Sequence, residues 1–336
     1  MKAAVFHALK QPLTIERVND PTPAPDELVI EVGRCGICGS DLHMTEEPMF
    51  GVPNGAILGH EFAGEIVALG ARAEGFKVGD RVAVAPLRGC GVCPPCRAGE
   101  VAWCERTMLL QGGGYGEYAT ATPRQCLKLP QSTSVEDGAL VEPLAVALHG
   151  VTRADMEPGA RVLVLGAGPI GLGAAFWARR RGASKVVVAD LFDTQRERAL
   201  AMGATDFVTV ESDAVARVHA AMGGAPEIVF ECAGKPGIVS AALEYLKPRG
   251  TIVMLGLCTQ PDSFVPFAAV QKEAKLVTSA FFTMGEYQAA LDMLDGGHAP
   301  PKAMITDTVA LAAMPAAFEA LRRRSHQCKV MVQPGG

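Results

Sequence analysis

The chain has 336 residues, of which 49% are hydrophobic and only 6% aromatic, and its formal net charge is −5. This length suffices for two domains with aliphatic cores, and the acidic balance argues against nucleic acid or an anionic membrane as the main partner. The N-terminal segment lacks the apolar core of a signal peptide, and the sequence contains no apolar run long enough to predict a membrane span. We therefore expect a cytoplasmic protein.

The N-terminal part of the chain is predicted to form short β-strands. The runs 28–35, 63–70 and 80–87 combine β-branched residues with flanking Gly, Pro and Asp turn residues. Residues 329–334, near the other end of the sequence, form an apolar run that predicts a strand returning to this first domain. The pattern indicates a β-rich domain assembled from both ends of the chain.

From about Pro158 onward the pattern changes to alternating strands and helices. Apolar strands are predicted at 161–166, 185–190, 206–210, 227–234, 251–256 and 275–282. Helices are predicted at 170–181, 195–202, 213–222, 237–246 and 285–294. Such alternation is typical of βαβ units with a buried parallel sheet, so the sequence predicts an α/β fold with a doubly wound second domain.

A Gly-rich segment, VLVLGAGPIGLG at 162–173, opens the first of these βαβ units. It contains a G-x-G-x-x-G motif between a predicted strand and a predicted helix, which is the context that dinucleotide binding requires. Asp190 ends the next strand, where a carboxylate binds ribose hydroxyls and repels a 2′-phosphate. NAD is therefore favoured, although Arg196 and Arg198 leave NADP open. The predicted cofactor-binding residues are Gly166, Gly168, Pro169, Ile170, Gly171 and Asp190.

Four cysteines in GCGVCPPCRAGEVAWC follow one another at the spacing C-x2-C-x2-C-x7-C: Cys90, Cys93, Cys96 and Cys104. Four thiolates on short Gly- and Pro-containing loops match the tetrahedral coordination of a closed, structural zinc site. Free or redox-active thiols and a nucleic-acid-binding knuckle are the alternatives for this segment alone.

A second metal site is predicted from separated segments. Cys38 offers a thiolate, His60 an imidazole and Glu142 a carboxylate, and this mixed set leaves a coordination position open, as in catalytic zinc sites. Cys35 and Cys38 together imitate a zinc knuckle, but the position of Cys35 in a strand favours a small buried thiol.

The motifs CGICGSDLH (35–43), GHEFAGE (59–65), the four-cysteine segment, EPLAVALH (142–149) and GAGPIG (166–171) occur in the order found in one family. Over essentially its whole length the chain resembles zinc-containing medium-chain dehydrogenases/reductases, and most closely their polyol branch. The resemblance implies a GroES-like catalytic domain at 1–145, completed by 285–336, and a Rossmann NAD-binding domain at 146–284. It also implies two zinc ions per chain and a homo-oligomer, either dimer or tetramer.

The same resemblance implies roles for single residues. Cys38 and His60 would be zinc ligands, with Glu61 or Glu142 completing the set directly or through water. Asp41 would orient the ring of His60, although it could instead cap a helix. Ser40 would contact the reacting oxygen, and His43 would relay the proton, unless it is an ordinary loop histidine.

The function implied is reversible hydride transfer between a secondary alcohol and NAD, with zinc polarising the alcohol or ketone oxygen. Carboxylates at Glu46 and Glu142 would favour a diol or polyol, whose second hydroxyl they could bind. The apolar side chains of Met44, Met49 and Phe50 would instead favour a hydrophobic or aryl secondary alcohol. A zinc-free quinone or enone reductase on the same fold and a zinc-dependent nucleic-acid-binding protein are the alternatives. No nucleic-acid or membrane partner is expected.

Overall fold

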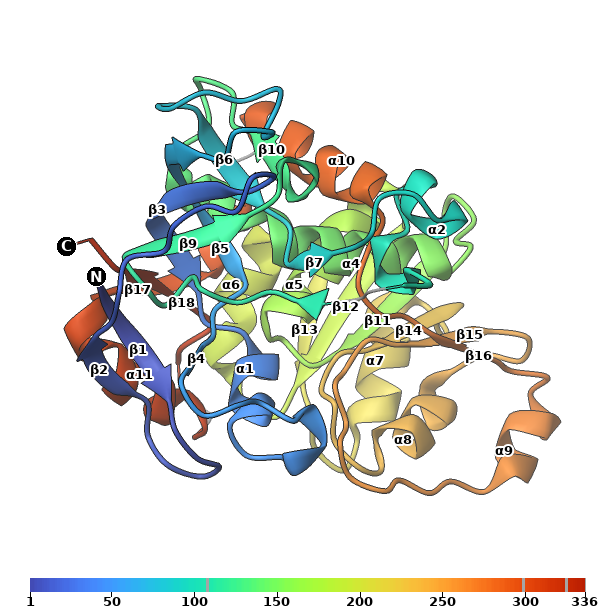
Figure 1. The fold of residues 1–336 in the computed structure, drawn as a ribbon. Helices are drawn as coiled ribbons and strands as arrows, with labels where there is room; N and C mark the ends of the chain where they lie inside the picture. Colours follow the sequence, from blue (N-terminus) through green and yellow to red (C-terminus); the bar gives the residue numbers. More distant parts are fainter. Residues whose placement is uncertain (107–108, 298–299, 324–325, 336) are drawn as a thin grey trace. The chain divides into compact units, whose positions relative to one another are not determined.

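The computed structural model describes residues 1–106, 109–297, 300–323 and 326–335. It divides into two compact units (Figure 1). Unit 1 comprises Met1–Glu142, Thr283–His298 and Ile305–Gly336, and unit 2 comprises Pro143–Phe282 and Ala299–Met304. Unit 1 is therefore built from distant parts of the chain, whereas most of unit 2 is one continuous segment.

Unit 1 is organised around a seven-stranded sheet whose two longest strands are β3 (Leu28–Gly36) and β5 (Glu61–Leu69). The strand order is β10 (Cys126–Lys128), β6 (Arg81–Val84), β5, β3, β18 (Lys329–Gln333) and β17 (Ile305–Ala310), and β9 (Tyr118–Ala121) also pairs with β3. The predicted return of the chain at 329–334 is confirmed, because β18 pairs with β3. The strand predicted at 80–87 is shorter, since Pro86 has no N–H for a sheet ladder.

Smaller elements complete unit 1. The remaining strands are β1 (Lys2–Phe6), β2 (Thr14–Arg17), β4 (Ala56–Ile57), β7 (Leu87–Arg88) and β8 (Leu109–Leu110). The helices are α1 (Gly39–Met44), α2 (Pro94–Arg97), α3 (Val135–Ala139), α10 (Met284–Asp295) and α11 (Met314–Leu321). Helix α4 (Val141–Arg153) begins in unit 1 and continues into unit 2. Short 3-10 turns occur at Pro48–Phe50, Val101–Trp103, Pro123–Gln125, Asp193–Gln195, Pro300–Met304 and Leu311–Ala313.

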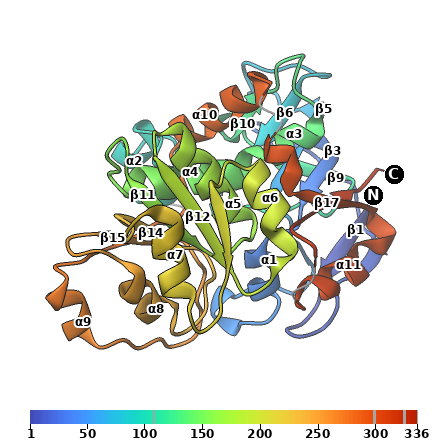
Figure 2. The same cartoon turned by 180° about the vertical axis from the view of Figure 1, so that it is seen from behind.

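Unit 2 contains a six-stranded parallel sheet (Figure 2). The order is β13 (Asp206–Thr209), β12 (Lys185–Asp190), β11 (Arg161–Leu165), β14 (Ile228–Glu231), β15 (Thr251–Met254) and β16 (Lys275–Thr278). The helices are α5 (Pro169–Arg180), α6 (Arg196–Ala201), α7 (Ala214–Met222), α8 (Ile238–Tyr245) and α9 (Pro266–Gln271). Helix α5 packs on β11 and β12, and α8 on β14 and β15. The predicted α/β class and doubly wound sheet are confirmed.

Apolar strands explain why this sheet is buried. Leu163, Val187, Val229 and Ile252, one from each of four neighbouring strands, are all fully buried in one core cluster. Parallel strands covered by helices on both faces need such continuous apolar runs. Strands β12 and β13 are added on one side of β11, whereas β14, β15 and β16 are added on its other side, so the order of the strands reverses between β11 and β14. In such sheets ligands bind beside the carboxyl ends of the strands at this point.

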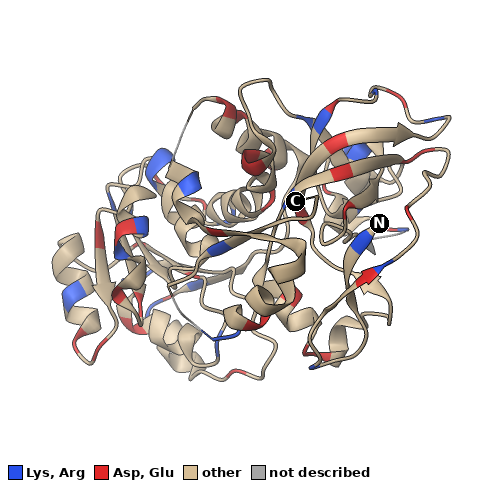
Figure 3. Ribbon diagram, turned by 90° about the vertical axis from the view of Figure 1, so that its left-hand side faces the viewer, with Lys and Arg blue, Asp and Glu red and all other residues tan. Residues whose placement is uncertain are grey.

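Charged residues are interspersed along the ribbon in the view of Figure 3. Surface ion pairs illustrate the pattern, such as Arg217 with Glu211 and Arg249 with Glu273. Within the described residues, no helix has both the length and the apolar character that crossing a bilayer would require.

Candidate metal centres and nucleotide site

The first candidate site lies where β3 and β5 end side by side in unit 1. Gly36, the last residue of β3, pairs with Glu61, the first residue of β5. Cys38 follows β3 and precedes helix α1, while His60 directly precedes β5. The sulfur of Cys38 and donor atoms of His60 and Glu61 all lie within 4.8 Å of one another. Strand pairing thus brings together residues more than twenty positions apart.

These three residues fit a zinc ion. A thiolate, an imidazole and a carboxylate are the donors that zinc takes in sites with an open position. His60 and Glu61 are buried, so their donor atoms are held within the protein. A Cβ at residue 36 would lie 2.1 Å from Oε2 of Glu61, so Gly36 leaves the space that this carboxylate occupies.

Ser40 and Asp41, both in helix α1, contact the same cluster. The Ser40 hydroxyl donates to the sulfur of Cys38 at 3.2 Å and lies 3.4 Å from Nε2 of His60. Oδ1 of Asp41 lies 3.2 Å from Nδ1 of His60, and Oδ2 accepts the N–H of Cys38. The sequence suggested two roles for Asp41, orienting the His60 ring or capping the helix. Asp41 makes both contacts, one to the imidazole ring and one to the N–H of Cys38 at the start of α1. His43 lies half-buried in the last turn of α1.

The charges in this cluster depend on one another. Burial acts to raise the pKa of Asp41, but His60 and the hydrogen bonds from His60, Tyr115 and Cys38 outweigh it, so the pKa is lowered. Burial acts to lower the pKa of His60, but Asp41 and Cys38 raise it well above its usual value. The protonated form of His60 is therefore stabilised when no metal is bound, because a metal competes with the proton for the ring nitrogen.

Glu142 and Lys329 are buried charged residues next to the cluster. Glu142 is not among the three residues whose donor atoms converge. Burial is the main cause that raises the pKa of Glu142 to about 7, with Glu61 and Asp41 adding to the rise and His60 and Lys329 opposing it. Nζ of Lys329 bonds both carboxylate oxygens of Glu61, at 2.7 and 2.5 Å, and also the carbonyl of Ile37.

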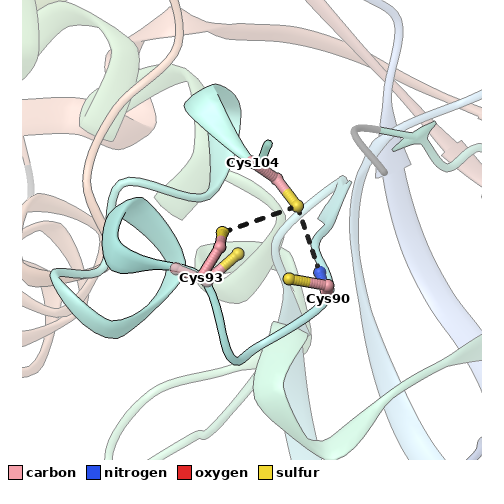
Figure 4. A group of neighbouring side chains, drawn as sticks. Cys90, Cys93 and Cys104 are labelled. Carbon is pink, nitrogen blue, oxygen red and sulfur yellow. Dashed lines mark hydrogen bonds between the residues drawn. The ribbon is translucent and has the colours of Figure 1, made fainter. Parts of the chain in front are cut away.

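The second candidate centre is the cysteine lobe (Figure 4). Donor atoms of Cys90, Cys93, Cys96 and Cys104 lie within 4.8 Å of one another. Hydrogen bonds from the N–H groups of Val92 and Cys93 lower the pKa of Cys90, whereas burial and the neighbouring thiols raise that of Cys96 to about 12. Four crowded thiols cannot all ionise without a cation between them, so this donor set fits a tetrahedral zinc ion.

Cys35 is not part of either cluster. It is fully buried in the core of unit 1, and burial raises the pKa of its thiol well above the usual value. The prediction that Cys35 is a buried core thiol is therefore confirmed.

The candidate nucleotide site lies in unit 2 at the carboxyl end of β11. Gly166 has a φ of +100°, which favours glycine, and a Cβ on Gly171 would lie 1.9 Å from the carbonyl oxygen of Gly166. Gly168 caps helix α5, and Pro169 and Ile170 form its first turn. Because this helix starts beside the strand end, its N–H groups can bind the phosphates of a dinucleotide.

Asp190 holds this turn from the adjacent strand β12. Its Oδ2 accepts the N–H of Ala167 at 2.7 Å, and its Oδ1 accepts the N–H of Phe192 at 3.2 Å. Arg196 is bonded to Asp193 and to the carbonyl of Phe207, and Arg198 to Thr194 and Gln195.

Sequence reasoning missed two residues at the first site, Lys329 and Tyr115. Lys329 begins an otherwise apolar predicted strand, and a lysine in such a position is a signal for a buried ion pair. Tyr115 lies in the Gly-rich segment GGGYG, where nothing in the sequence indicates that its hydroxyl reaches Asp41.

Two family models match the chain. The alcohol dehydrogenase GroES-like domain matches residues 24–131, and the zinc-binding dehydrogenase domain matches residues 169–296. Among curated proteins, sorbitol dehydrogenase of Bacillus subtilis is 34% identical, over 99% of this chain and 97% of its own. A probable D-xylulose reductase A of Aspergillus clavatus is 33% identical, over 89% and 87%.

Solved structures match at the level of the whole chain. The 2R,3R-butanediol dehydrogenase of Bacillus subtilis has a TM-score of 0.87 and 29% identity, covering 99% of both chains. A candidate zinc-binding dehydrogenase of Sinorhizobium meliloti, bound to NADP, has a TM-score of 0.89 and 30% identity over 99% of both. An alcohol dehydrogenase of Escherichia coli complexed with NADH has a TM-score of 0.89 and 29% identity, with the same coverage.

Proposed function

Because this chain belongs to the family of zinc-containing medium-chain alcohol and polyol dehydrogenases, we propose that it transfers hydride reversibly between a secondary alcohol and NAD. The observation that carries the proposal is the convergence of Cys38, His60 and Glu61 within 4.8 Å, with the Ser40 hydroxyl beside two of them. The zinc-free reductase and the nucleic-acid-binding protein are not favoured, since the matching family models are those of zinc-binding alcohol dehydrogenases.

We assign unit 1 as the catalytic domain and unit 2 as the nucleotide-binding domain. Each chain would hold two zinc ions, one at Cys38, His60 and Glu61, and one in the cysteine lobe. When bound at the first site, zinc supplies a Lewis acid that polarises the oxygen of the alcohol or ketone. Glu142 would line that site without being a direct ligand, because it does not converge with the other three donors.

The residues of helix α1 would bind and move the proton. The Ser40 hydroxyl would accept the proton from the alcohol, and its distances to Cys38 and His60 support this role. His43, one turn further along the same helix, would pass the proton to solvent. Asp41 would hold the ring of His60 through Nδ1, so that Nε2 faces the Ser40 side of the cluster.

The substrate class follows from relatives and from local charge. Sorbitol, xylulose and butanediol carry a hydroxyl beside the reacting carbon, and enzymes named for these compounds match this chain. Glu46 is a weaker candidate for binding the second hydroxyl of a substrate than the sequence suggested, because its carboxylate is paired with Arg322 at 2.8 Å. We therefore propose a secondary alcohol, with a vicinal diol or polyol as the preferred form.

NAD would be preferred to NADP. Asp190 offers a buried carboxylate beside the phosphate-binding turn, where it would repel a 2′-phosphate. The two nearby cations that could bind that phosphate, Arg196 and Arg198, are already bonded to neighbouring groups.

We also propose a homo-oligomer in a reducing compartment such as the cytoplasm. Phe267 in helix α9 and Val265, the residue that precedes this helix, are both exposed, and large exposed apolar residues mark interaction surfaces. Thiolates in both proposed metal sites need reducing conditions.

The test combines metal analysis with kinetics. We expect two zinc ions per chain and NAD⁺ reduction, followed at about 340 nm, with kcat/KM higher for 2,3-butanediol or sorbitol than for 2-butanol, 1-phenylethanol and ethanol. Cys38→Ser should lose one zinc and all turnover while staying folded, because the cysteine lobe is a separate closed site. Cys96→Ser should instead lose stability. Loss of both metals and of the fold in Cys38→Ser, or ethanol as the best substrate, would contradict the proposal.

A further inference from the structure

Tyr115 places a hydroxyl in the core of unit 1, where a single residue, Asp41, links it to the proposed zinc ligand His60. Its side chain is fully buried, and its hydroxyl donates to Oδ2 of Asp41 at 2.5 Å. The other oxygen of Asp41 lies 3.2 Å from Nδ1 of His60. A continuous hydrogen-bonded chain therefore runs from Tyr115 through Asp41 to His60.

This chain fixes the orientation of the Asp41 carboxylate. Oδ2 accepts two hydrogen bonds, from the Tyr115 hydroxyl and from the N–H of Cys38 at 3.2 Å. A buried carboxylate is costly unless hydrogen bonds replace its water, and with Oδ2 held from two directions the plane of the carboxylate is set. Oδ1 then points toward His60 and fixes which imidazole nitrogen remains for the metal.

The backbone around Tyr115 supports His60 from a second direction. The N–H of Tyr115 donates to the carbonyl of Leu58, and the N–H of Gly114 to that of Gly59. Gly59 has a φ of +85°, and a Cβ there would lie 2.6 Å from the Tyr115 ring. The ring therefore lies against the turn that immediately precedes His60. The ring of Phe318, in α11, packs against the Tyr115 ring in a T-shaped arrangement with the centroids 6.4 Å apart.

We propose that Tyr115 is a positioning residue for the catalytic zinc site, acting through Asp41 to hold His60 in the orientation that binds metal. The inference rests on the proposed metal site at Cys38, His60 and Glu61. It concerns the hydroxyl, because a phenylalanine ring would fill the same space in the core and keep the contacts with Gly59 and Phe318.

The test is Tyr115→Phe, with Tyr118→Phe as the matched control that removes the same group from neighbouring strand β9. Purified protein is incubated with increasing EDTA, and the remaining zinc is measured by atomic emission. We expect Tyr115→Phe to release one zinc at about a tenfold lower chelator concentration, within the range known for residues that orient metal ligands. The second zinc should be released at the same chelator concentration as in wild type and in Tyr118→Phe. The thermal midpoint of Tyr115→Phe should fall modestly, because the buried Asp41 carboxylate loses one of its hydrogen bonds.

A double-mutant cycle separates positioning from general loosening of the core. If Tyr115 acts through Asp41, the effect of Tyr115→Phe on zinc release should disappear in an Asp41→Asn background. If the effect is unchanged there, the hydroxyl acts by another route and the inference is wrong.

A measurement on the wild-type sequence covers the case in which Tyr115→Phe does not fold. The chain has four tyrosines, so 3-fluorotyrosine labelling gives four ¹⁹F resonances, and Tyr118→Phe, Tyr245→Phe and Tyr287→Phe assign the remaining one to Tyr115. Partial removal of zinc by EDTA should shift the Tyr115 resonance and leave that of Tyr245 in unit 2 unchanged. A Tyr115 resonance insensitive to this removal overturns the inference.

Failure of the premise would be recognised separately. A wild-type protein that holds zinc only in the cysteine lobe would remove the proposed catalytic site and this inference with it. A wild type with two zinc ions, together with a Tyr115→Phe variant that releases them as wild type does, would leave the proposed function intact and overturn this inference alone.

Discussion

At the scale of single residues, the carboxylate of Glu61 serves two partners. It belongs to the donor cluster with Cys38 and His60, and both its oxygens bond Nζ of Lys329. A carboxylate has about four lone-pair positions, so one group can accept from a lysine and still face a metal. Lys329 therefore balances negative charge that would otherwise accumulate among Glu61, Glu142 and Asp41.

Replacing Lys329 tests this balance. In the zinc-free protein, Lys329→Met should lower the free energy of unfolding by about 3–5 kcal/mol, because it leaves the buried charge of Glu61 without a neighbouring cation. Urea denaturation measures the change. The double variant Glu61→Gln with Lys329→Met should recover part of the loss, and Lys329→Arg is the charge-conserving control. A small effect of Lys329→Met would mean that Glu61 does not depend on this cation.

Asp190 is the residue on which cofactor choice should depend. Asp190→Ser removes the acceptor for the N–H of Ala167 and the carboxylate that we propose binds the ribose. The kcat/KM for NAD⁺ should fall about 10- to 100-fold, as expected for a lost charge-assisted bond, while that for NADP⁺ holds or rises. Initial rates with both cofactors measure the ratio. A wild-type preference for NADP⁺ would contradict the charge argument and direct attention to Arg196.

The sequence predicts the residues of a functional site only when they belong to a short local motif that is typical of a known chemistry. Cys38, His60, the four cysteines of the lobe and Gly166 lie in short motifs whose residue types match a known chemistry. Lys329 becomes part of the site only through the pairing of β18 with β3, and Tyr115 only through backbone bonds of its loop to Leu58 and Gly59. Such contacts between distant segments leave no local pattern. The choice between Glu61 and Glu142 was open for the same reason.

At the scale of elements, the starts of β11 and β14 are joined by a charged cluster. Glu227, next to β14, accepts bonds from the N–H, Nε and Nη2 of Arg161 in β11, and from Nζ of Lys247. Burial acts to raise the pKa of Glu227, but the bonds from Arg161 and Lys247 lower it from 4.5 to about 2. The cluster thus ties two neighbouring parallel strands together at their start.

This cluster predicts a pH dependence of stability. Because the folded-state pKa is depressed, the stabilisation is complete above the ordinary value of 4.5 and is lost as the pH falls from there toward 2. Glu227→Gln should cost about 1–2 kcal/mol at neutral pH, since the side chain is partly exposed. The difference from wild type in urea unfolding should shrink below pH 4.5. A difference that is constant with pH would contradict this role.

Element prediction succeeded where the pattern was regular. The predicted strands of the parallel sheet and the helices α5, α6, α7, α8 and α10 are confirmed, with ends shifted by a few residues, because apolar β-branched runs and helical periodicity recur there. Strand β17 and helix α11 were not predicted. Strand β17 is only partly buried along its length, so its pattern does not show the apolar alternation that identifies a half-buried strand.

At the scale of the whole molecule, the exposed apolar side chains of α9 concern assembly. Val265, Phe267 and Val270 are 68%, 62% and 67% exposed. We expect wild type to be an oligomer by size-exclusion chromatography with light scattering, and Phe267→Asp to shift it toward smaller species, because a carboxylate at a buried interface is strongly unfavourable. Leu200→Glu, on α6, is the control for an exposed leucine elsewhere in unit 2. A monomeric wild type would contradict the proposed assembly.

The position of β18 in the chain has a consequence for biosynthesis. On the ribosome, nearly all of unit 2 emerges as one uninterrupted stretch and can fold while synthesis continues. The sheet of unit 1 must wait, because β3 and β5 emerge early whereas β18, which pairs with β3, emerges after unit 2. During this interval Glu61 has no Lys329 beside it, and the flank of β3 that β18 will cover is an open strand edge, the kind of surface that binds other chains. The nascent protein should therefore depend on chaperones most while its Rossmann-type half is already complete.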